Sequence, residues 1–261
     1  MNADYHVHSV FSEDCEVPLE TMIQGAIEKG LEEICFTEHM DLGVPTCINC
    51  DCDAFKAAFY ELKEKYADRI TMRFGMEYGM QVHTIEPYQQ NFNTYDYDFI
   101  IMSCHQVDNL EFCRQGYQQG RTQLEYNMGY YEEILKCVQQ YKDYSIIGHL
   151  DMVCRYDMQG ILPFKYIRDI AAEIMKQAIS DGKGIEVNTS SFRYKLLDLT
   201  PSRDILRLYR DVGGEVLTIG SDAHSPYYIA HHFDEVKAEL REMGFKRFCT
   251  YEKMQPIWHA L

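Results

Sequence analysis

The chain has 261 residues, of which 46% are hydrophobic and 25% charged, the proportions of an ordinary globular protein. Its formal net charge is −16, with 41 acidic against 25 basic residues, so its surface repels nucleic-acid phosphates and anionic lipids. We therefore expect neither a nucleic acid nor a membrane among its partners, whereas a small phosphate compound is compatible with a site that bound metal ions make locally positive.

Short β-type runs alternate with longer helical patterns along the chain. A first strand is predicted at residues 4–7, and a helix follows over 18–30, with Pro18 in its first turn and Gly30 at its end. The later strands are predicted at residues 33–37, 71–77, 98–103, 145–150, 184–188 and 216–221, with a last short one near 247–250. The later helices are predicted near residues 53–67, 121–141, 163–181, 201–213 and 229–243, and the segment before 98 is also expected to be helical.

Strands that alternate with helices at this spacing predict βαβ units and a parallel sheet. Seven such repeats indicate an α/β fold whose sheet closes into a barrel, and a barrel of this kind typically needs about 250 residues. We therefore expect residues 1–261 to form a single domain.

Histidines and acidic residues stand where these strands end. His6 and His8 close the first strand, and period-two geometry points both side chains to the same face. The later strands end at or beside Glu38, His39, Glu77, His105, His149, Asn188, Asp222 and His224. Because the C-terminal ends of barrel strands meet at one mouth, the fold itself would bring these groups together.

Imidazole and carboxylate groups are ligands that suit Zn, Mn and Fe ions. These groups are too many for one ion, so the sequence predicts two or three divalent metal ions. A lone histidine at a strand end is usually a structural residue, and the prediction therefore depends on the combined pattern. Four further histidines lie outside it and are expected to be structural or exposed: His83, His231, His232 and His259.

The same segments resemble the PHP (polymerase and histidinol phosphatase) superfamily, with the motifs in family order over residues 1–230. The motifs are Asp4–Ser9, Ser12–Asp14, Thr37–His39, Gly75–Glu77, Ser103–His105, Gly148–Asp151, Glu186–Asn188 and Gly220–His224. The chain length and the segment His149–Tyr156 resemble the histidinol-phosphate phosphatase branch. The resemblance implies a distorted (β/α)7 TIM-like barrel and hydrolysis of L-histidinol phosphate to L-histidinol and phosphate, a step of histidine biosynthesis.

The family pattern also implies the metal ligands, in one group for each ion. The groups are His6, His8, Glu77 and Asp222; Glu77, His105 and His149; and Asp14, His39 and His224. Glu13 is an alternative to Asp14 in the same loop. Where the family often has Asp before the histidine of the second strand, this chain has Glu38, and its role stays open.

The chemistry that this resemblance implies is metal-dependent hydrolysis. A water between the ions loses its proton near neutral pH and becomes the nucleophile, while the ions neutralise charge on the phosphoryl oxygens. Arginine matches phosphate oxygens in a bidentate manner, so Arg155 and Arg193, which follow the fifth and sixth strands, are the candidates for substrate binding. Glu38, Asp151 or a metal-bound water could protonate the leaving alcohol.

Three other functions stay open. A PHP-type enzyme acting on a nucleotide or sugar phosphate would share the fold and the metal ions. An amidohydrolase also begins with an HxH pair, but that family uses a lysine at the end of the fourth strand, where this chain has Ser103–His105. A non-catalytic PHP scaffold would have lost ligand residues, and this chain keeps them.

The cysteines and the N-terminal residues bear on location. The N-terminal segment lacks a basic stretch followed by an apolar one, so we expect no secretion signal, and we expect the ten cysteines to be reduced thiols in the cytoplasm. Cys47, Cys50 and Cys52 could form a structural zinc site, but no second distant pair completes a set of four. We therefore expect a loop near the mouth. The oligomeric state has no signal in the sequence.

Overall fold

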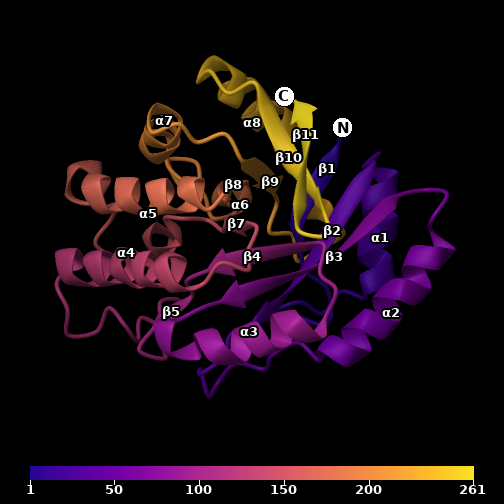
Figure 1. The fold of residues 1–261 in the computed structure, drawn as a ribbon, viewed down its shortest axis with the longest axis horizontal. Helices are drawn as coiled ribbons and strands as arrows, with labels where there is room; N and C mark the ends of the chain where they lie inside the picture. Colours follow the sequence, from indigo (N-terminus) through magenta and orange to yellow (C-terminus); the bar gives the residue numbers. More distant parts are fainter.

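The computed structural model describes residues 1–261, and its centre is a parallel sheet of seven strands (Figure 1). Every neighbouring pair in the order β1-β2-β3-β4-β7-β8-β9 is parallel. The strands are β1 Ala3–Val7, β2 Glu33–Met40, β3 Thr71–Gly79, β4 Phe99–Ser103, β7 Ile146–Ile147, β8 Gly184–Asn188 and β9 Leu217–Gly220. This order follows the chain, as expected of successive βαβ units.

The two edges of the sheet meet, so the sheet forms a nearly closed barrel. Val7 and Ala223 form an isolated parallel bridge across the seam, and the His8 amide donates to the Ala223 carbonyl at 3.0 Å. The Asp4 carboxylate reinforces the seam, because it accepts from the Ser221 amide at 2.9 Å. The predicted (β/α)7 TIM-like barrel is therefore confirmed.

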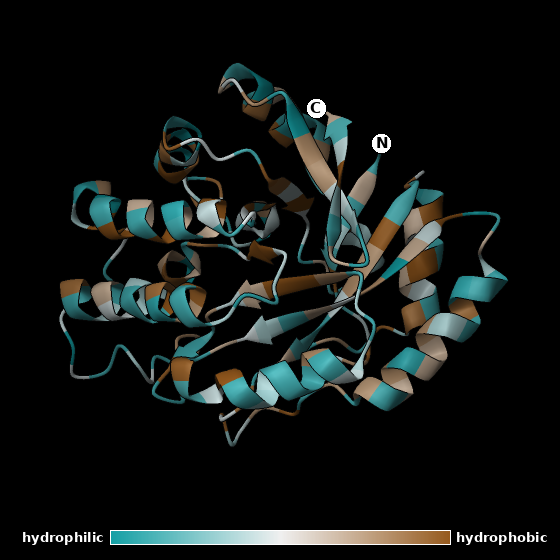
Figure 2. Ribbon diagram, viewed as in Figure 1, coloured by the Kyte–Doolittle hydropathy of each residue, from teal (hydrophilic) through white to brown (hydrophobic).

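Apart from the short α6 at the mouth, the helices lie around the outside of the barrel (Figure 1) and turn their apolar stripes toward the strands (Figure 2). They are α1 Leu19–Glu28, α2 Cys52–Lys65, α3 Ile85–Thr94, α4 Gln123–Gln140, α5 Arg168–Ser180, α6 Ser190–Arg193, α7 Arg203–Asp211 and α8 Phe233–Glu242. Local signals set their ends: Thr122 and Glu125 form a capping box at α4, and Gly30 takes a φ of +73° just after α1. None of the helices combines the length and the apolar character that a membrane span requires.

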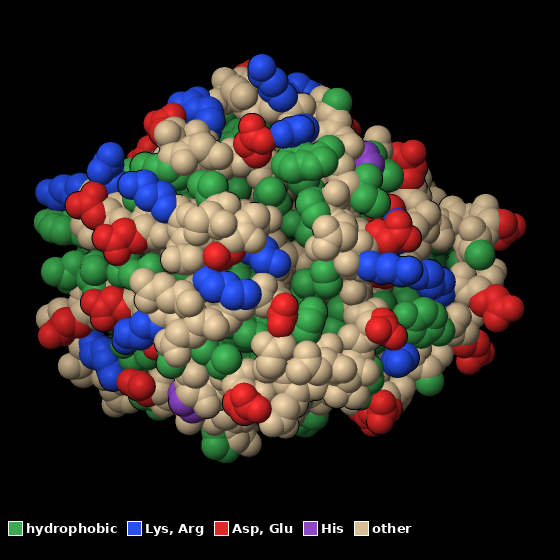
Figure 3. Space-filling view, in the orientation of Figure 1, with side chains coloured by type: hydrophobic (Ala, Val, Ile, Leu, Met, Phe, Trp, Pro, Cys, Tyr) green, Lys and Arg blue, Asp and Glu red, His purple; other side chains and the backbone are tan.

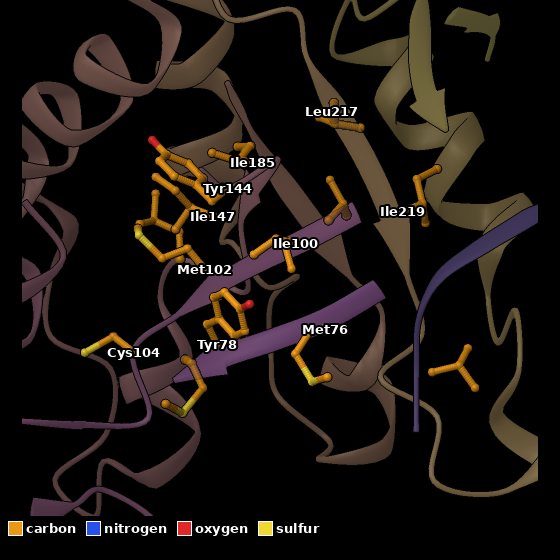
Figure 4. Packing of buried hydrophobic residues seen from close by; sticks show 14 of the residues in the cluster. Met76, Tyr78, Ile100, Met102, Cys104, Tyr144, Ile147, Ile185, Leu217 and Ile219 are labelled. Atoms are coloured by element: carbon orange, nitrogen blue, oxygen red, sulfur yellow. The ribbon is translucent and has the colours of Figure 1, made fainter. Parts of the chain in front are cut away.

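Alternating strand residues divide the apolar core into two parts. The larger cluster of 62 buried residues fills the space between strands and helices, and Figure 4 shows Met102, Ile147 and Ile185 of neighbouring strands packing side by side there. A smaller cluster of eight residues, including Ile101 and Ile146, fills the barrel interior. Since successive strand residues face opposite sides, Ile146 belongs to the inner cluster and Ile147 to the outer one.

A C-terminal hairpin seals the barrel at the end opposite the strand C-termini. It consists of β10 Arg247–Glu252 and β11 Gln255–Ala260, which pair antiparallel. Cys249 and Tyr251 of β10 belong to the inner cluster, and the Tyr5 hydroxyl of β1 donates to the Tyr251 carbonyl at 2.9 Å. The final strand predicted near 247–250 therefore exists, but it pairs with β11 and not with the barrel sheet.

The fifth barrel strand is much shorter than predicted. The expected strand covers residues 145–150, whereas β7 contains only Ile146 and Ile147. The Gly148 amide still donates to the Met102 carbonyl of β4 at 3.0 Å, but the His149 amide donates to the side chain of Glu186 at 2.9 Å and not to a neighbouring strand. A small hairpin after β4, formed by β5 Gln106–Val107 and β6 Leu110–Glu111, was not predicted either.

Candidate metal centre

The nine residues predicted as metal ligands come together at the C-terminal mouth of the barrel. They are His6, His8, Asp14, His39, Glu77, His105, His149, Asp222 and His224. Most of them stand in or just after a barrel strand, so the parallel sheet itself delivers them to one place. The period-two prediction for the first strand agrees with the structure, in which the rings of His6 and His8 lie 5.0 Å apart.

Glu77 of β3 is the centre of this group. Its carboxylate oxygens lie 2.9–3.6 Å from a ring nitrogen of each of five histidines. These are His6, His8, His39, His105 and His149. Glu77 is fully buried. A buried carboxylate shared by so many imidazoles is arranged as a bridge between neighbouring sites and not as the partner of one residue.

Asp222 and Asp14 provide the other two carboxylates of the group. Asp222 Oδ1 lies 3.7 Å from His8 Nε2 and 3.6 Å from His224 Nδ1. Asp14 Oδ2 lies 3.0 Å from His224 Nε2 and 3.7 Å from His39 Nε2. Glu13, the alternative to Asp14, instead accepts a hydrogen bond from the backbone amide of Ile48.

His39 lies between the carboxylates of Glu77 and Asp14. Its Nδ1 lies 3.1 Å from Glu77 Oε2, while its Nε2 faces Asp14. The family pattern places His39 with Asp14 and His224 alone, but the structure also places it within 4.8 Å of the ligand atoms of Glu77 and His105. His39 therefore borders two candidate ion positions.

Two carboxylates without a role predicted from the sequence contact the far ring nitrogens of the histidines. Glu186 Oε1 lies 2.6 Å from His6 Nδ1, and Asp41 Oδ1 lies 2.8 Å from His105 Nδ1. A carboxylate on the far ring nitrogen fixes the imidazole and raises its basicity as a ligand. The sequence carries a signal for both, since Glu186 is two residues from Asn188 and Asp41 is two residues from His39, on the same faces of their strands.

Two glycines make room for these pairs. A Cβ atom on Gly79 would overlap with Asp41 Oδ1 and press against His105 Nδ1. A Cβ atom on Gly220 would overlap with Glu186 Oε1 and with the Cβ of His6. Both positions therefore require glycine, because a larger residue would overlap with these carboxylate–histidine pairs.

The electrostatics keep the carboxylates of the cluster ionised. Burial alone would raise the pKa of Glu77, but His6, His105 and His39 hold it well below its usual value. Burial would also raise the pKa of Asp222, but His6 and Arg155 keep it well below the usual range. For His8, burial lowers the pKa well below 6.5, and the neighbouring histidines lower it further. The centre thus offers charged oxygens and a neutral imidazole.

This donor set fits divalent metal ions. Four groups of three histidine or carboxylate side chains each place their ligand atoms within 4.8 Å of one another. His8 Nε2 is buried and has no hydrogen-bond partner, which leaves its lone pair available to an ion. Glu77, Asp222, Asp14 and Asp41 would also repel a phosphate compound unless bound cations offset their charge. Clustered carboxylates and neutral imidazoles are the ligands that such ions take.

The metal centre opens into a pocket with a volume of about 230 Å³. Arg155 lines its wall, with Nη2 2.6 Å from Ser190 Oγ and 3.3 Å from Asp222 Oδ2, and its guanidinium lies over the ring of Tyr194. Arg193 is not among the lining residues; its Nη1 donates to the Asp222 carbonyl at 2.8 Å. Only the first of the two predicted arginines therefore reaches the pocket directly.

The two carboxylates considered as proton donors for the leaving group do not line this pocket. Glu38 is fully buried and accepts hydrogen bonds from Ser9 and Ser12. Asp151 borders a separate cavity of about 150 Å³, and its Oδ2 accepts from the Ser202 amide at 2.7 Å.

The three clustered cysteines follow β2 beside the mouth. Cys47 lines the pocket, whereas Cys50 and Cys52 are buried, and all three are free thiols. The Cys52 Sγ is a hydrogen-bond partner of the Asn91 side chain at 3.4 Å. The loop lies near the mouth, as expected.

The seven-stranded α/β barrel with a histidine and carboxylate cluster at its mouth places the chain among α/β-barrel proteins with a candidate metal site. Residues 4–190 match the family model of the PHP domain, and the chain belongs to this family.

Curated relatives extend over nearly the whole chain. It is 30% identical to the histidinol-phosphatase of Lactococcus lactis subsp. lactis (strain IL1403), covering 97% of this chain and 95% of the relative. It is 21% identical to the histidinol-phosphatase of Saccharomyces cerevisiae, covering 96% of this chain and 92% of that relative.

A solved structure shares both the fold and part of the sequence. It is the histidinol phosphate phosphatase of Lactococcus lactis subsp. lactis, in complex with zinc, L-histidinol and phosphate. The two structures have a TM-score of 0.91 and 28% sequence identity, and the match covers 98% of each chain. The neighbour contains zinc, and this chain has clustered histidine and carboxylate groups that could hold a metal ion.

Proposed function

We propose that this protein is a metal-dependent phosphoric monoester hydrolase that converts L-histidinol phosphate to L-histidinol and phosphate, a step of histidine biosynthesis. The observation that carries the proposal is the convergence of five histidines on the buried carboxylate of Glu77, beside a pocket that contains Arg155. The similarity to histidinol-phosphatases over nearly the whole chain supports the choice of substrate.

We propose two or three divalent ions, Zn, Mn or Fe, held by the nine residues named above. Ligand atoms from different elements lie close enough for several ions, and Glu77 would be shared between two of them. When bound, such ions supply a hydroxide nucleophile at neutral pH and neutralise the phosphoryl oxygens. Glu186 and Asp41 hold His6 and His105 in position for this task.

The phosphate group would bind beside Asp222, where Arg155 presents its guanidinium to the pocket. Tyr194 under the guanidinium and Ser190 beside it fix the orientation of the side chain, so little rotamer entropy is lost on binding. Arg193 supports the same wall by binding the backbone of Asp222, and we propose that it contributes to phosphate binding indirectly.

Two acidic residues of the pocket support a cationic substrate. Glu13 and Glu111 both line the pocket, and the Glu111 carboxylate also pairs with Arg114 at 3.2 Å. An amino alcohol with an imidazole ring carries positive charge or hydrogen-bond donors at the end remote from its phosphate. Acidic side chains in the pocket favour such a compound over a nucleotide or a sugar phosphate, which lack a primary ammonium group.

We further propose that residues 1–261 work as one domain in the cytoplasm. The C-terminal hairpin completes the barrel interior that β1 begins, so the described elements share one core. The ten cysteines are free thiols, which suits a reducing compartment.

The test is phosphate release from L-histidinol phosphate by metal-reconstituted protein, beside a panel of nucleotide and sugar phosphates. We expect strong preference for L-histidinol phosphate and loss of activity on chelation. If the protein hydrolyses only the other monoesters, the proposed substrate is wrong, whereas the proposed metal-dependent hydrolysis of phosphate monoesters is retained. Absence of any hydrolysis by metal-loaded protein would support a non-catalytic scaffold.

A further inference from the structure

The hydroxyl of Ser12 lies at a buried junction of three groups. Its oxygen is 2.6 Å from Glu38 Oε2, 3.0 Å from the backbone nitrogen of His39 and 3.1 Å from His8 Nδ1. Ser12 is only 2% exposed, so water does not compete for these contacts. A serine hydroxyl has one proton to donate and two lone pairs, and this junction therefore fixes where each hydrogen atom lies.

The carboxylate determines the direction of these hydrogen bonds. Glu38 Oε2 also accepts from the backbone amide of Ser9 at 3.0 Å, and an amide can only donate. Oε2 is therefore an acceptor, and the Ser12 proton points to it. The Ser12 oxygen must then accept from both of its other partners, the amide of His39 and Nδ1 of His8.

We propose that Glu38, acting through Ser12, is a positioning residue that holds the proton of His8 on Nδ1 and so presents a bare Nε2 to the metal centre. This inference rests on the metal centre of the proposed function. The ring stacks on those of His39 and His224, at centroid distances of 4.2 and 4.4 Å, and these contacts restrict its rotation. Its Nε2 has no hydrogen-bond partner, and the oxygens of Glu77 and Asp222 lie 3.6 and 3.7 Å away.

His8 is thus oriented differently from its neighbours. Glu186 and Asp41 contact the far nitrogens of His6 and His105 directly, whereas the carboxylate of Glu38 reaches His8 only through a serine. Which nitrogen of a histidine binds metal is set by the hydrogen bond that the other nitrogen makes. Loss of such an outer partner typically lowers metal affinity about 10- to 100-fold.

The experiment compares Ser12→Ala with Ser9→Ala. Both variants remove one buried hydroxyl that binds Glu38, but only Ser12 also contacts the two histidines. The His8 tautomer is measured in metal-free protein by ¹⁵N NMR of the imidazole nitrogens, and Zn²⁺ affinity is measured by chelator competition. We expect the Nδ1–H tautomer in wild type and Ser9→Ala, and its loss in Ser12→Ala with a fall in Zn²⁺ affinity of about 10- to 100-fold.

Glu38→Gln separates hydrogen-bond direction from charge. The amide oxygen of glutamine can replace Oε2 and accept from Ser9 and Ser12, so this variant should keep the Nδ1–H tautomer and a Zn²⁺ affinity within about tenfold of wild type. An Nε2–H tautomer in wild type, or equal Zn²⁺ affinity of Ser12→Ala and wild type, would overturn the inference. So would a loss in Glu38→Gln as large as that in Ser12→Ala. Because neither readout uses substrate, failure of the proposed phosphatase activity is seen separately.

Discussion

Replacing Arg155 by methionine should weaken phosphate binding with little change in the shape of the pocket wall. The arginine side chain is 6% exposed, and its guanidinium lies 4.2 Å from the centre of the Tyr194 ring. Methionine keeps a flexible apolar stem that can pack on the same ring, but it removes the charge and every donor. The change therefore isolates the polar contribution of one side chain.

The size of the effect follows from the donors that Arg155 can offer. Nη2 is held by Ser190 and Asp222, while Nε is buried without a partner. A hydrogen bond to a charged group contributes about 1.5–3 kcal/mol, so two bonds to a phosphate would contribute roughly 3–6 kcal/mol. We expect kcat/KM for L-histidinol phosphate to fall by roughly 10²- to 10⁴-fold.

Arg193→Met is the matched control. Arg193 also binds Asp222, through its backbone carbonyl, but it does not line the pocket. The assay measures phosphate release together with the metal content of each variant, because loss of an arginine beside Asp222 can also disturb the ions. We expect the control to lose less than about tenfold in kcat/KM.

Arg155 does not bind the phosphate as proposed if Arg155→Met, with its full metal content, keeps kcat/KM within about threefold of wild type. The same conclusion follows if Arg193→Met loses more activity than Arg155→Met at equal metal content. Either result would mean that the phosphate binds elsewhere in the mouth.

Three further predictions test the centre and its surroundings. Glu77→Gln leaves a single acceptor oxygen for five histidines, so the variant should lose at least one metal ion per chain in elemental analysis; full metal content would contradict the bridging role. Gly79→Ala places a Cβ against the Asp41–His105 pair and should lower Zn²⁺ affinity by about 10- to 100-fold in chelator competition, whereas unchanged affinity would show that the pair is dispensable. Burial raises the pKa of Asp151 to about 7, well above its value of about 3.9 in an unfolded chain. Its contribution to stability is therefore present below about pH 4 and is lost as the pH rises to about 7, with an upper limit on the order of 4 kcal/mol. Asp151→Asn should remove this pH dependence in urea unfolding of the chelated protein, and an unchanged slope would refute the assignment.

The barrel and the convergence of the candidate ligand residues could be predicted because they depend on patterns within single segments. Each strand is a short apolar run, and a histidine or acid at its end is visible without knowledge of its neighbours. The convergence of the ends then follows from parallel pairing alone, as in the register that sets His39 beside Glu77.

The supporting residues depend on relations between segments, and these were not predicted. Glu186 and Asp41 have the right face and spacing, but their histidine partners, His6 and His105, are distant in sequence. The early end of β7 has the same origin, because the amide of His149 binds the side chain of Glu186 from another strand. The residue pattern within a single segment does not indicate such contacts between distant segments.

The hairpin that seals the barrel also has a consequence for folding during synthesis. Tyr5 is synthesised long before its partner, because its hydroxyl binds the backbone of Tyr251, 246 positions later. Until that later segment emerges, the inner layer that includes Tyr5, Phe99 and Ile101 has no cover at one end. Aromatic and aliphatic side chains at that end therefore stay exposed until β10 has been synthesised and has packed against them.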